Sequence, residues 1–160
     1  ALLEAPTVVG DFDGDGILDT NDIDLLTDAV HQPNAELRFD LNGDSAVTLA
    51  DREVWVEGLR GTYFGDANLD GEFSSADFVA VFQIGEYEDA VDGNSTWADG
   101  DWNGDRDFTS GDFVLAFQAG GYELGPRQAV SMVPEPGSLF TAWLGLLSVT
   151  VFGTQRRNRR

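Results

Sequence analysis

Aspartate side chains recur at every second position at the start of a twelve-residue segment, 11–22, of this 160-residue chain. The segment has aspartates at positions 1, 3, 5, 9 and 12 and a glycine at position 6. A twelve-residue calcium loop binds its ion through side-chain oxygens at positions 1, 3, 5 and 9, a backbone carbonyl at 7 and a carboxylate at 12. Position 6 favours glycine because the chain turns there with positive φ. The spacing therefore predicts a site for a hard cation such as Ca²⁺.

Three further segments, 40–51, 66–77 and 101–112, repeat this spacing, with neutral oxygens replacing some of the carboxylates. We number the segments loops one to four in chain order and expect up to four Ca²⁺ ions in them. In each loop the residue at position 7 is predicted to offer its backbone carbonyl, and the other ligands are side chains. The predicted ligands are Asp11, Asp13, Asp15, Ile17, Asp19 and Asp22; Asp40, Asn42, Asp44, Ala46, Thr48 and Asp51; Asp66, Asn68, Asp70, Glu72, Ser74 and Asp77; and Asp101, Asn103, Asp105, Asp107, Thr109 and Asp112.

The four loops are expected to differ in affinity. Loop one carries five aspartates, so we expect it to bind the cation most tightly. Ser45 and Arg106 replace glycine at position 6 of loops two and four, where a side chain at positive φ costs about 1 kcal/mol. These two loops should therefore bind more weakly. The alternative is that Asp, Asn and Gly only form turns, but four copies in register, each followed by an apolar run, argue against it.

Helices that follow the loops are the elements expected to position them. Residues 65–88 align without gaps on 100–123, identical at 14 of 24 positions, and 11–30 resemble 40–59 more loosely. Apolar residues recur at near-helical spacing after each loop, whereas Pro, Gly and β-branched residues precede the loops. We expect each helix to begin at a loop aspartate that also caps it, and the apolar residue at position 8 to pair two loops back to back. The predicted unit is a loop followed by a helix, and the fold class is mainly α.

The composition excludes several other kinds of chemistry. Acidic residues number 29 against nine basic ones, and the net charge of −20 argues against nucleic-acid binding. The chain has no Cys and a single His, His31, which excludes thiolate chemistry and imidazole metal clusters. Carboxylate pairs can hydrolyse glycosides, but the clustered aspartates are already assigned to the loops, and we expect no catalytic residues. Trp97 and Trp102 are expected to pack in the core rather than to stack on sugars.

The loops with their single following helices resemble the dockerin type I repeat, whose signature is a Gly-Asp-x-Asn-x-Asp-Gly loop ending in Asp. Segments 10–22, 65–77 and 100–112 match this signature well, and 39–51 matches it less closely. The resemblance implies calcium in the loops and docking onto a cohesin-like module through the helices and loop positions 10 and 11. The positions implied for the partner are Thr20, Asn21, Ser75, Ala76, Ser110 and Gly111, with Leu49 and Ala50 at the same positions of loop two.

The resemblance also divides the chain into two dockerin-like pairs, 1–60 (the first pair) and 61–124 (the second pair). The connection between them is short, which favours mutual packing. Each pair of roughly 60 residues is near the lower size limit for a self-sufficient core. Clustered carboxylates also repel one another until a cation neutralises them. We therefore expect calcium binding and folding to be one equilibrium.

The composition changes after Tyr122, with a linker expected at 125–132 and a signal at 133–160. The 19 uncharged residues of 137–155 would span about 28 Å as a helix, close to the thickness of a bilayer. An Arg-rich end follows, so we expect a helix in the inner membrane with the body outside, rather than a buried core helix. The tail resembles the PEP-CTERM sorting signal, which implies an exosortase-like processing enzyme and release to the cell surface or extracellular matrix. The motif residues are Pro134, Glu135 and Pro136.

The chain opens without Met or a signal peptide, so we expect the C-terminal part of a longer exported protein, or a chain whose leader was removed. The leading hypothesis is a non-catalytic calcium-binding module for attachment or assembly. One alternative is the anchoring end of a larger secreted polysaccharide-degrading enzyme. The other is a calcium-rigidified structural stalk that has no partner.

Overall fold

The computed structural model describes residues 8–127, and its regular elements are helices. No strand forms among these residues beyond one isolated bridge, so the predicted mainly α class is confirmed for the described part of the chain. A π-helical segment, η2 (Val54–Arg60), continues the second helix, and two 3-10 turns, η1 (Leu37–Phe39) and η3 (Trp97–Asp99), lie between loops. The main helices are α1 (Thr20–Val30), α2 (Leu49–Glu53), α3 (Ser75–Ile84) and α4 (Ser110–Ala119).

The predicted membrane helix at 137–155 and the sorting motif lie outside the described residues, as does most of the predicted linker. Among the helices that are described, none has the length and apolar character needed to cross a bilayer. Both loop pairs belong to one compact unit, Ala1–Ala129.

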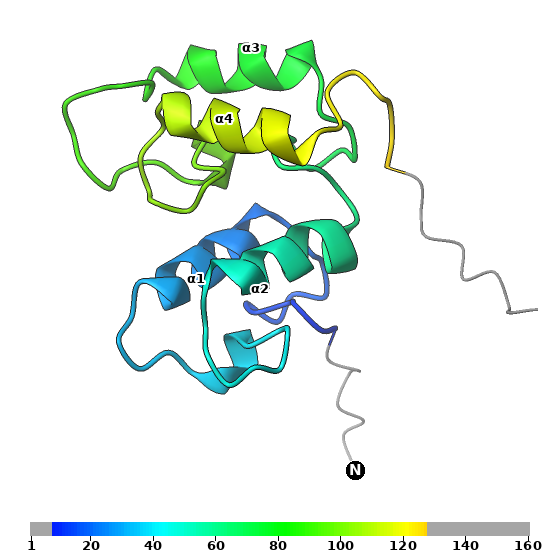
Figure 1. Ribbon diagram of the computed structural model, residues 1–160, viewed down its shortest axis with the longest axis vertical. Helices are drawn as coiled ribbons and strands as arrows, with labels where there is room; N and C mark the ends of the chain where they lie inside the picture. The colour runs from blue at the N-terminus through cyan, green and yellow to red at the C-terminus, as the bar shows by residue number, and fades with distance from the viewer. Residues whose placement is uncertain (1–7, 128–160) are drawn as a thin grey trace, which may run out of the picture. The chain divides into compact units, whose positions relative to one another are not determined.

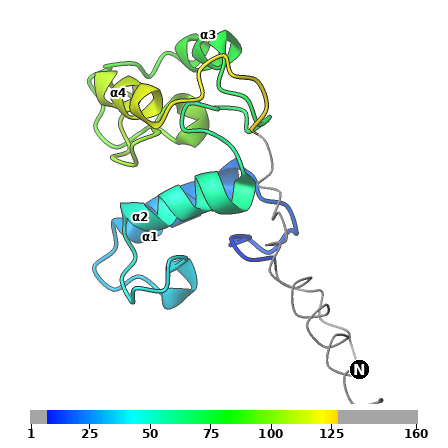
Figure 2. The ribbon, with the colours of Figure 1, turned by 45° about the vertical axis from the view of Figure 1, so that its right-hand side comes forward.

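The helices lie in pairs, α1 beside α2 and α3 beside α4 (Figures 1 and 2). Aromatic rings fill the space between α3 and α4. The ring centroid of Phe113 on α4 lies 5.6 Å from that of Phe78 and 5.8 Å from that of Phe82, both on α3. Because each loop leads directly into its helix, this packing fixes the position of the last residues of each loop.

Each helix starts inside its loop with a capping box. The N-cap is the residue at loop position 9; in loop one, Asp19 accepts the backbone N–H of Asn21, as predicted for a loop aspartate. The aspartate at position 12 is the third helical residue and accepts the N–H of the N-cap, which completes the box. The prediction of an aspartate cap is wrong for the other helices, since a hydroxyl side chain supplies the short oxygen that the cap needs. The caps of α2, α3 and α4 are Thr48, Ser74 and Thr109.

In the second pair, the residues at loop position 8 form backbone hydrogen bonds, but these bonds do not join the two loops to each other as predicted. The carbonyl of Phe73 in loop three accepts the N–H of Glu123, which follows α4, at 2.8 Å. The carbonyl of Phe108 in loop four accepts the N–H of Glu88, which follows α3, at 2.8 Å. Glu88 and Glu123 have φ of 46° and 56°, a left-handed turn that folds the chain back after each helix. The segment after each helix therefore occupies the position at which the other loop was expected.

One apolar core runs through both pairs. Trp55, Trp97 and Trp102 are fully buried in it, which confirms the prediction of core packing for Trp97 and Trp102. The indole N–H of Trp97 donates to the carbonyl of Asp66 at 2.8 Å, and that of Trp55 donates to the carbonyl of Gly10 at 2.9 Å. The core is thus bonded directly to the first residue of loop three and to the residue that precedes loop one.

A methyl group at Gly65 is expected to disturb this core. Gly65 precedes loop three with a φ of 101°, and a Cβ atom there would overlap the ring of Phe73. Gly65→Ala should lower the free energy of unfolding by about 2–4 kcal/mol, through left-handed strain and overpacking together. Gly85→Ala is the matched control, because Gly85 has a φ of 95° and open space around it. Thermal unfolding followed by circular dichroism should show the larger loss at Gly65, and equal losses would contradict the role of Phe73.

Candidate metal-binding loops

The aspartate at position 1 organises the first half of each loop. In loop one, the carboxylate of Asp11 accepts the N–H of Gly14 at 2.7 Å and that of Gly16 at 2.9 Å. The same carboxylate lies inside the turn in the other loops, where it accepts an N–H from position 4 or 6. The corresponding donors are Gly43 to Asp40 at 2.8 Å, Gly71 to Asp66 at 2.8 Å and Gly104 to Asp101 at 2.7 Å.

The aspartate at position 12 ties the end of each loop to its beginning. Asp22 accepts the N–H of Phe12 at 2.6 Å with one oxygen and the N–H of Asp19 at 3.0 Å with the other. This bidentate arrangement brings the position-12 carboxylate beside the start of the loop. The equivalent aspartates accept from position 2 in the same way, Asp51 from Leu41 at 2.8 Å, Asp77 from Ala67 at 3.0 Å and Asp112 from Trp102 at 2.9 Å.

The side chains at positions 3 and 5 each accept the backbone N–H two residues further along the chain, which fixes the orientation of their oxygens. The side chain of Asp13 accepts the N–H of Asp15 at 3.1 Å, and the side chain of Asp15 accepts the N–H of Ile17 at 2.8 Å. In the other loops an asparagine replaces Asp13 and keeps the same bond. Asn42 accepts the N–H of Asp44 at 2.9 Å, Asn68 that of Asp70 at 2.9 Å and Asn103 that of Asp105 at 2.7 Å.

The carbonyls at position 7 accept no hydrogen bond from the described residues, and so remain available to a cation.

Carboxylates converge closely enough to hold a metal ion in two of the loops. Asp11, Asp13 and Asp15 of loop one each offer an oxygen within 4.8 Å of the others. Asp101, Asp105 and Asp112 of loop four do the same. Loops two and three form no such group within the described residues. In loop three, the hydroxyl of Thr62 donates to the carboxylate of Asp66 and holds it at the core side of the loop.

Left-handed backbone occurs at position 6, as the sequence predicts, and also at position 4. Ser45 and Arg106 at position 6 have φ of 71° and 72°, the conformation that makes glycine favourable there. Arg106 also forms an ion pair with Asp28 of α1 at 2.8 Å, although a pair as exposed as this one adds little stability. Sequence reasoning missed position 4, although glycine at that position in three loops was a visible signal. The position-4 angles are 82° at Gly14, 76° at Gly43, 56° at Leu69 and 84° at Gly104.

Burial raises the pKa of several loop carboxylates, so that their charged form is disfavoured in the absence of a cation. It raises the pKa of Asp66 to about 6, against the ordinary 3.8, because desolvation outweighs the hydrogen bonds from Thr62 and Gly71. Burial likewise raises the pKa of Asp101 to about 6, although the charge of Arg52 opposes the shift. The pKa values of Asp77 and Asp112 are raised for the same reason. All-oxygen ligands and desolvated carboxylates fit a hard divalent cation, which would restore the charge balance.

The positions implied for a partner lie on the first turns of the helices. Asn21 on α1 is exposed, and Thr20 is partly exposed. Leu49 and Ala50 of loop two are exposed but line a hollow of about 600 Å³ together with Leu115 of α4. The first pair therefore presents loop two toward the second pair. Ser75, Ala76, Ser110 and Gly111 are all exposed.

Comparison with known proteins adds no assignment to this geometry. The chain matches no protein-family model, no curated protein and no solved structure.

Proposed function

We propose that this chain is a non-catalytic calcium-binding module that serves attachment or assembly of an exported protein. The observation that carries the proposal is the hydrogen-bond pattern repeated in the loops, in which the carboxylates at positions 1 and 12 each accept backbone N–H groups of their own loop. The oxygen-bearing side chains of each loop also have the sequence spacing of a calcium loop, which supports the proposal. The resemblance of the loop sequences to the dockerin type I repeat supports the same function.

Calcium suits these loops better than other metals. The ligands at positions 1, 3, 5, 9 and 12 are carboxylate, amide and hydroxyl oxygens, and no loop contains His or Cys. Hard oxygen sets favour Ca²⁺ or Mg²⁺ over transition metals. A twelve-residue loop with a backbone carbonyl supports the high and flexible coordination that Ca²⁺ takes, whereas Mg²⁺ demands a tighter octahedron. Four ions would change the formal charge from −20 to −12.

The surface proposed for attachment is the α3–α4 face, formed by Val79 and Phe82 of α3 and Val114 and Phe117 of α4. These side chains are 51–57% exposed. The only charged residues of the two helices, Asp77 and Asp112, are buried, so the helices themselves add no exposed charge to this face of a strongly acidic chain. Helices that are apolar on all sides are usually covered. A cohesin-like module is the proposed partner, consistent with the exposed partner positions at the start of both helices.

Export and sorting complete the proposal. The body lies outside the cell, and the C-terminal segment 137–155 anchors it in the inner membrane until an exosortase-like enzyme acts at the motif Pro134–Pro136. The order of motif, apolar segment and Arg-rich end supports this part. The same placement fits a module at the end of a larger secreted polysaccharide-degrading enzyme.

A calcium-rigidified stalk is the second candidate function. The side-chain contacts between the first and second pairs favour it, because they join the pairs into a single stiff unit. A stalk needs no partner on the α3–α4 face.

Docking and stalk functions can be separated by titrating the protein with a purified type I cohesin module, in calcium and in chelator. We expect calcium-dependent binding, and we expect the double variant Val79→Ser, Val114→Ser to weaken it at least about tenfold. Val91→Ser is the matched control, because Val91 is 57% exposed and lies outside the face. Equal loss of binding in the control would contradict docking through this face. No binding by the unmodified protein would contradict docking altogether and favour the stalk.

A further inference from the structure

The side chain of Arg52, on α2 of the first pair, is buried against loop four of the second pair. Arg52 is only 1% exposed. Its guanidinium donates to the carbonyl of Asp101 at 3.1 Å and to that of Trp102 at 3.2 Å, the first two residues of loop four. The carboxylates that face this charge include Asp101 and Asp112 of loop four and Asp24 of α1. The two carbonyls are the hydrogen-bond acceptors of this guanidinium among the described residues, and its Nε atom is buried without a partner.

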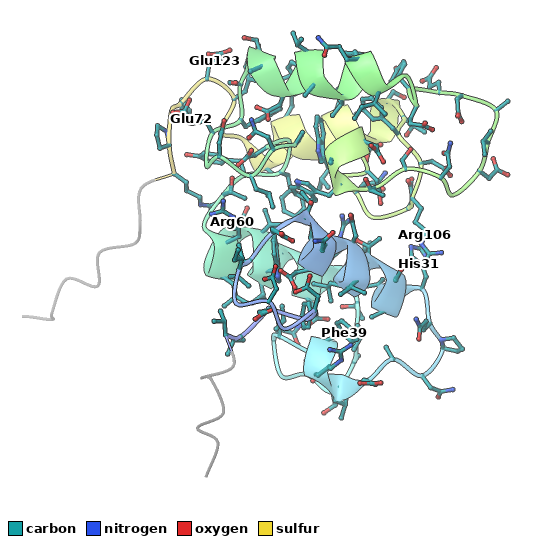
Figure 3. The ribbon with its side chains drawn as sticks, turned by 180° about the vertical axis from the view of Figure 1, so that it is seen from behind. His31, Phe39, Arg60, Glu72, Arg106 and Glu123 are labelled. Atoms are coloured by element: carbon teal, nitrogen blue, oxygen red, sulfur yellow. The ribbon has the colours of Figure 1, made fainter. Side chains whose placement is uncertain are left out.

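Other side chains of the first pair also form hydrogen bonds and an ion pair with the loops of the second pair. His31, which follows α1, lies with its Nε2 atom 2.7 Å from the carbonyl of Gly104. Asp28 of α1 pairs with Arg106 of loop four at 2.8 Å, and Figure 3 shows Arg106 and His31 side by side at this boundary. Arg60 of η2 donates to the carbonyl of Leu69, so it binds position 4 of loop three as His31 binds position 4 of loop four.

Gly104 shows that the fit between Arg52 and loop four is close. A Cβ atom on Gly104 would overlap the guanidinium of Arg52 and would lie 2.9 Å from Cδ2 of Leu49. Gly14 and Gly43 occupy the same position in loops one and two, and a Cβ atom on either would meet nothing within 4 Å. Glycine is therefore required at position 4 of loop four by the first pair as well as by its φ.

We propose that Arg52 is a positioning residue that joins the two pairs into one cooperative unit, so that the order of loop four depends on the first pair. The metal-related consequence rests on the proposed function. If calcium binding orders the first pair, it also favours the ordered form of loop four. By linkage, calcium binding to loop four favours the ordered first pair to the same extent. Loop four, with Arg106 at the glycine position, would then bind its ion as part of the whole unit.

Glycine amides provide a reporter in each loop for testing this coupling. The N–H groups of Gly14, Gly43, Gly71 and Gly104 each donate to the position-1 aspartate of loops one to four. Urea unfolding of the full chain in excess calcium, followed by nitrogen–proton correlation spectra, should give four superimposed curves. In Arg52→Met, the curves of Gly71 and Gly104 should move about 1 M lower in urea than those of Gly14 and Gly43, since two charged hydrogen bonds are lost.

Two matched controls distinguish the coupling from general destabilisation. Arg38→Met removes the same charge and a bond of the same kind, from Arg38 to the carbonyl of Phe12 at 2.9 Å, but within the first pair. Gly14→Ala introduces the same left-handed strain as Gly104→Ala without the overlap on Arg52. In Gly14→Ala and Gly104→Ala the amide of the new alanine serves as the reporter of its loop. Arg38→Met and Gly14→Ala should shift the four curves together, whereas Gly104→Ala should separate them as Arg52→Met does.

The proposal is overturned if the four curves are separate in the unmodified protein, or if they stay superimposed in both Arg52→Met and Gly104→Ala. Failure of the proposed function has a different signature, because the spectrum would then not respond to calcium or chelator. In that case the same urea curves, recorded without calcium, still test the role of Arg52.

Discussion

Replacing Asp22 by asparagine should lower the calcium affinity of loop one by about 100-fold or more. This loss is larger than the usual loss of affinity when a residue that only hydrogen-bonds to a metal ligand is replaced. Asp22 is the position-12 carboxylate, and both of its oxygens are held at the loop by N–H groups of Phe12 and Asp19. Asparagine removes one charge from the proposed ligand set and places an NH₂ group where one oxygen accepts a bond. A calcium titration monitored through the Gly14 amide measures the change directly.

Asp13→Asn in the same loop is the control for that prediction. It removes the same formal charge, but asparagine already occupies this position in loops two to four and accepts the same backbone bond there. The loop should therefore keep its conformation and lose roughly tenfold or less in affinity, about 1.4 kcal/mol. Equal losses in Asp22→Asn and Asp13→Asn would mean that only net charge matters, and would contradict the assigned role of position 12.

Calcium should reverse the pH dependence of stability. In chelator, the native pKa values of Asp66 and Asp101 are about 6, whereas the ordinary value of 3.8 applies to the unfolded chain. Between these values the native state binds more protons than the unfolded state, so the stability of the metal-free protein falls as pH rises through this window. With calcium in excess, protons compete with the ion, and stability should rise with pH over the same window.

The reversal can be measured as helix content and midpoint of thermal unfolding at about pH 5 and about pH 7.5, on either side of the shifted pKa values. The chelated protein should be more stable at the lower pH and the calcium-loaded protein at the higher pH. In the variant carrying Asp66→Asn and Asp101→Asn, the metal-free protein should lose most of its pH dependence. The same direction of change in chelator and in calcium would contradict metal binding by these carboxylates.

The loops were predictable from sequence because their structure is local. A hydrogen bond between two residues of the same loop spans no more than ten positions, as between Phe12 and Asp22, so the spacing of the ligands was enough to identify the loops. The positive φ at Ser45 and Arg106 followed from the same pattern and is confirmed. The caps of α2, α3 and α4 were mistaken because aspartate, serine and threonine are nearly equivalent at an N-cap, and only the folded geometry selects position 9.

The contacts between the pairs were not predictable, because they join distant parts of the chain. Arg52 and Trp102 are 50 residues apart, and His31 and Gly104 are 73 residues apart. Nothing in the local sequence marks Arg52 as different from the half-exposed Arg38. The backbone bonds of Phe73 and Phe108, at position 8 of loops three and four, join each loop to the segment that follows the helix of the other loop. These bonds also depend on how α3 packs against α4. A short connection between the pairs favoured mutual packing, but it did not specify which side chains would meet.

The most direct test of calcium binding coupled to folding is calorimetric titration of the compact unit, residues 1–129, with CaCl₂ after chelator treatment. Circular dichroism should be recorded in parallel on the same samples. The proposed function predicts three or four bound ions and a gain of helix as they bind. No heat of binding, together with full helix content in chelator, would show that the loops are turns without a metal and would contradict the central claim.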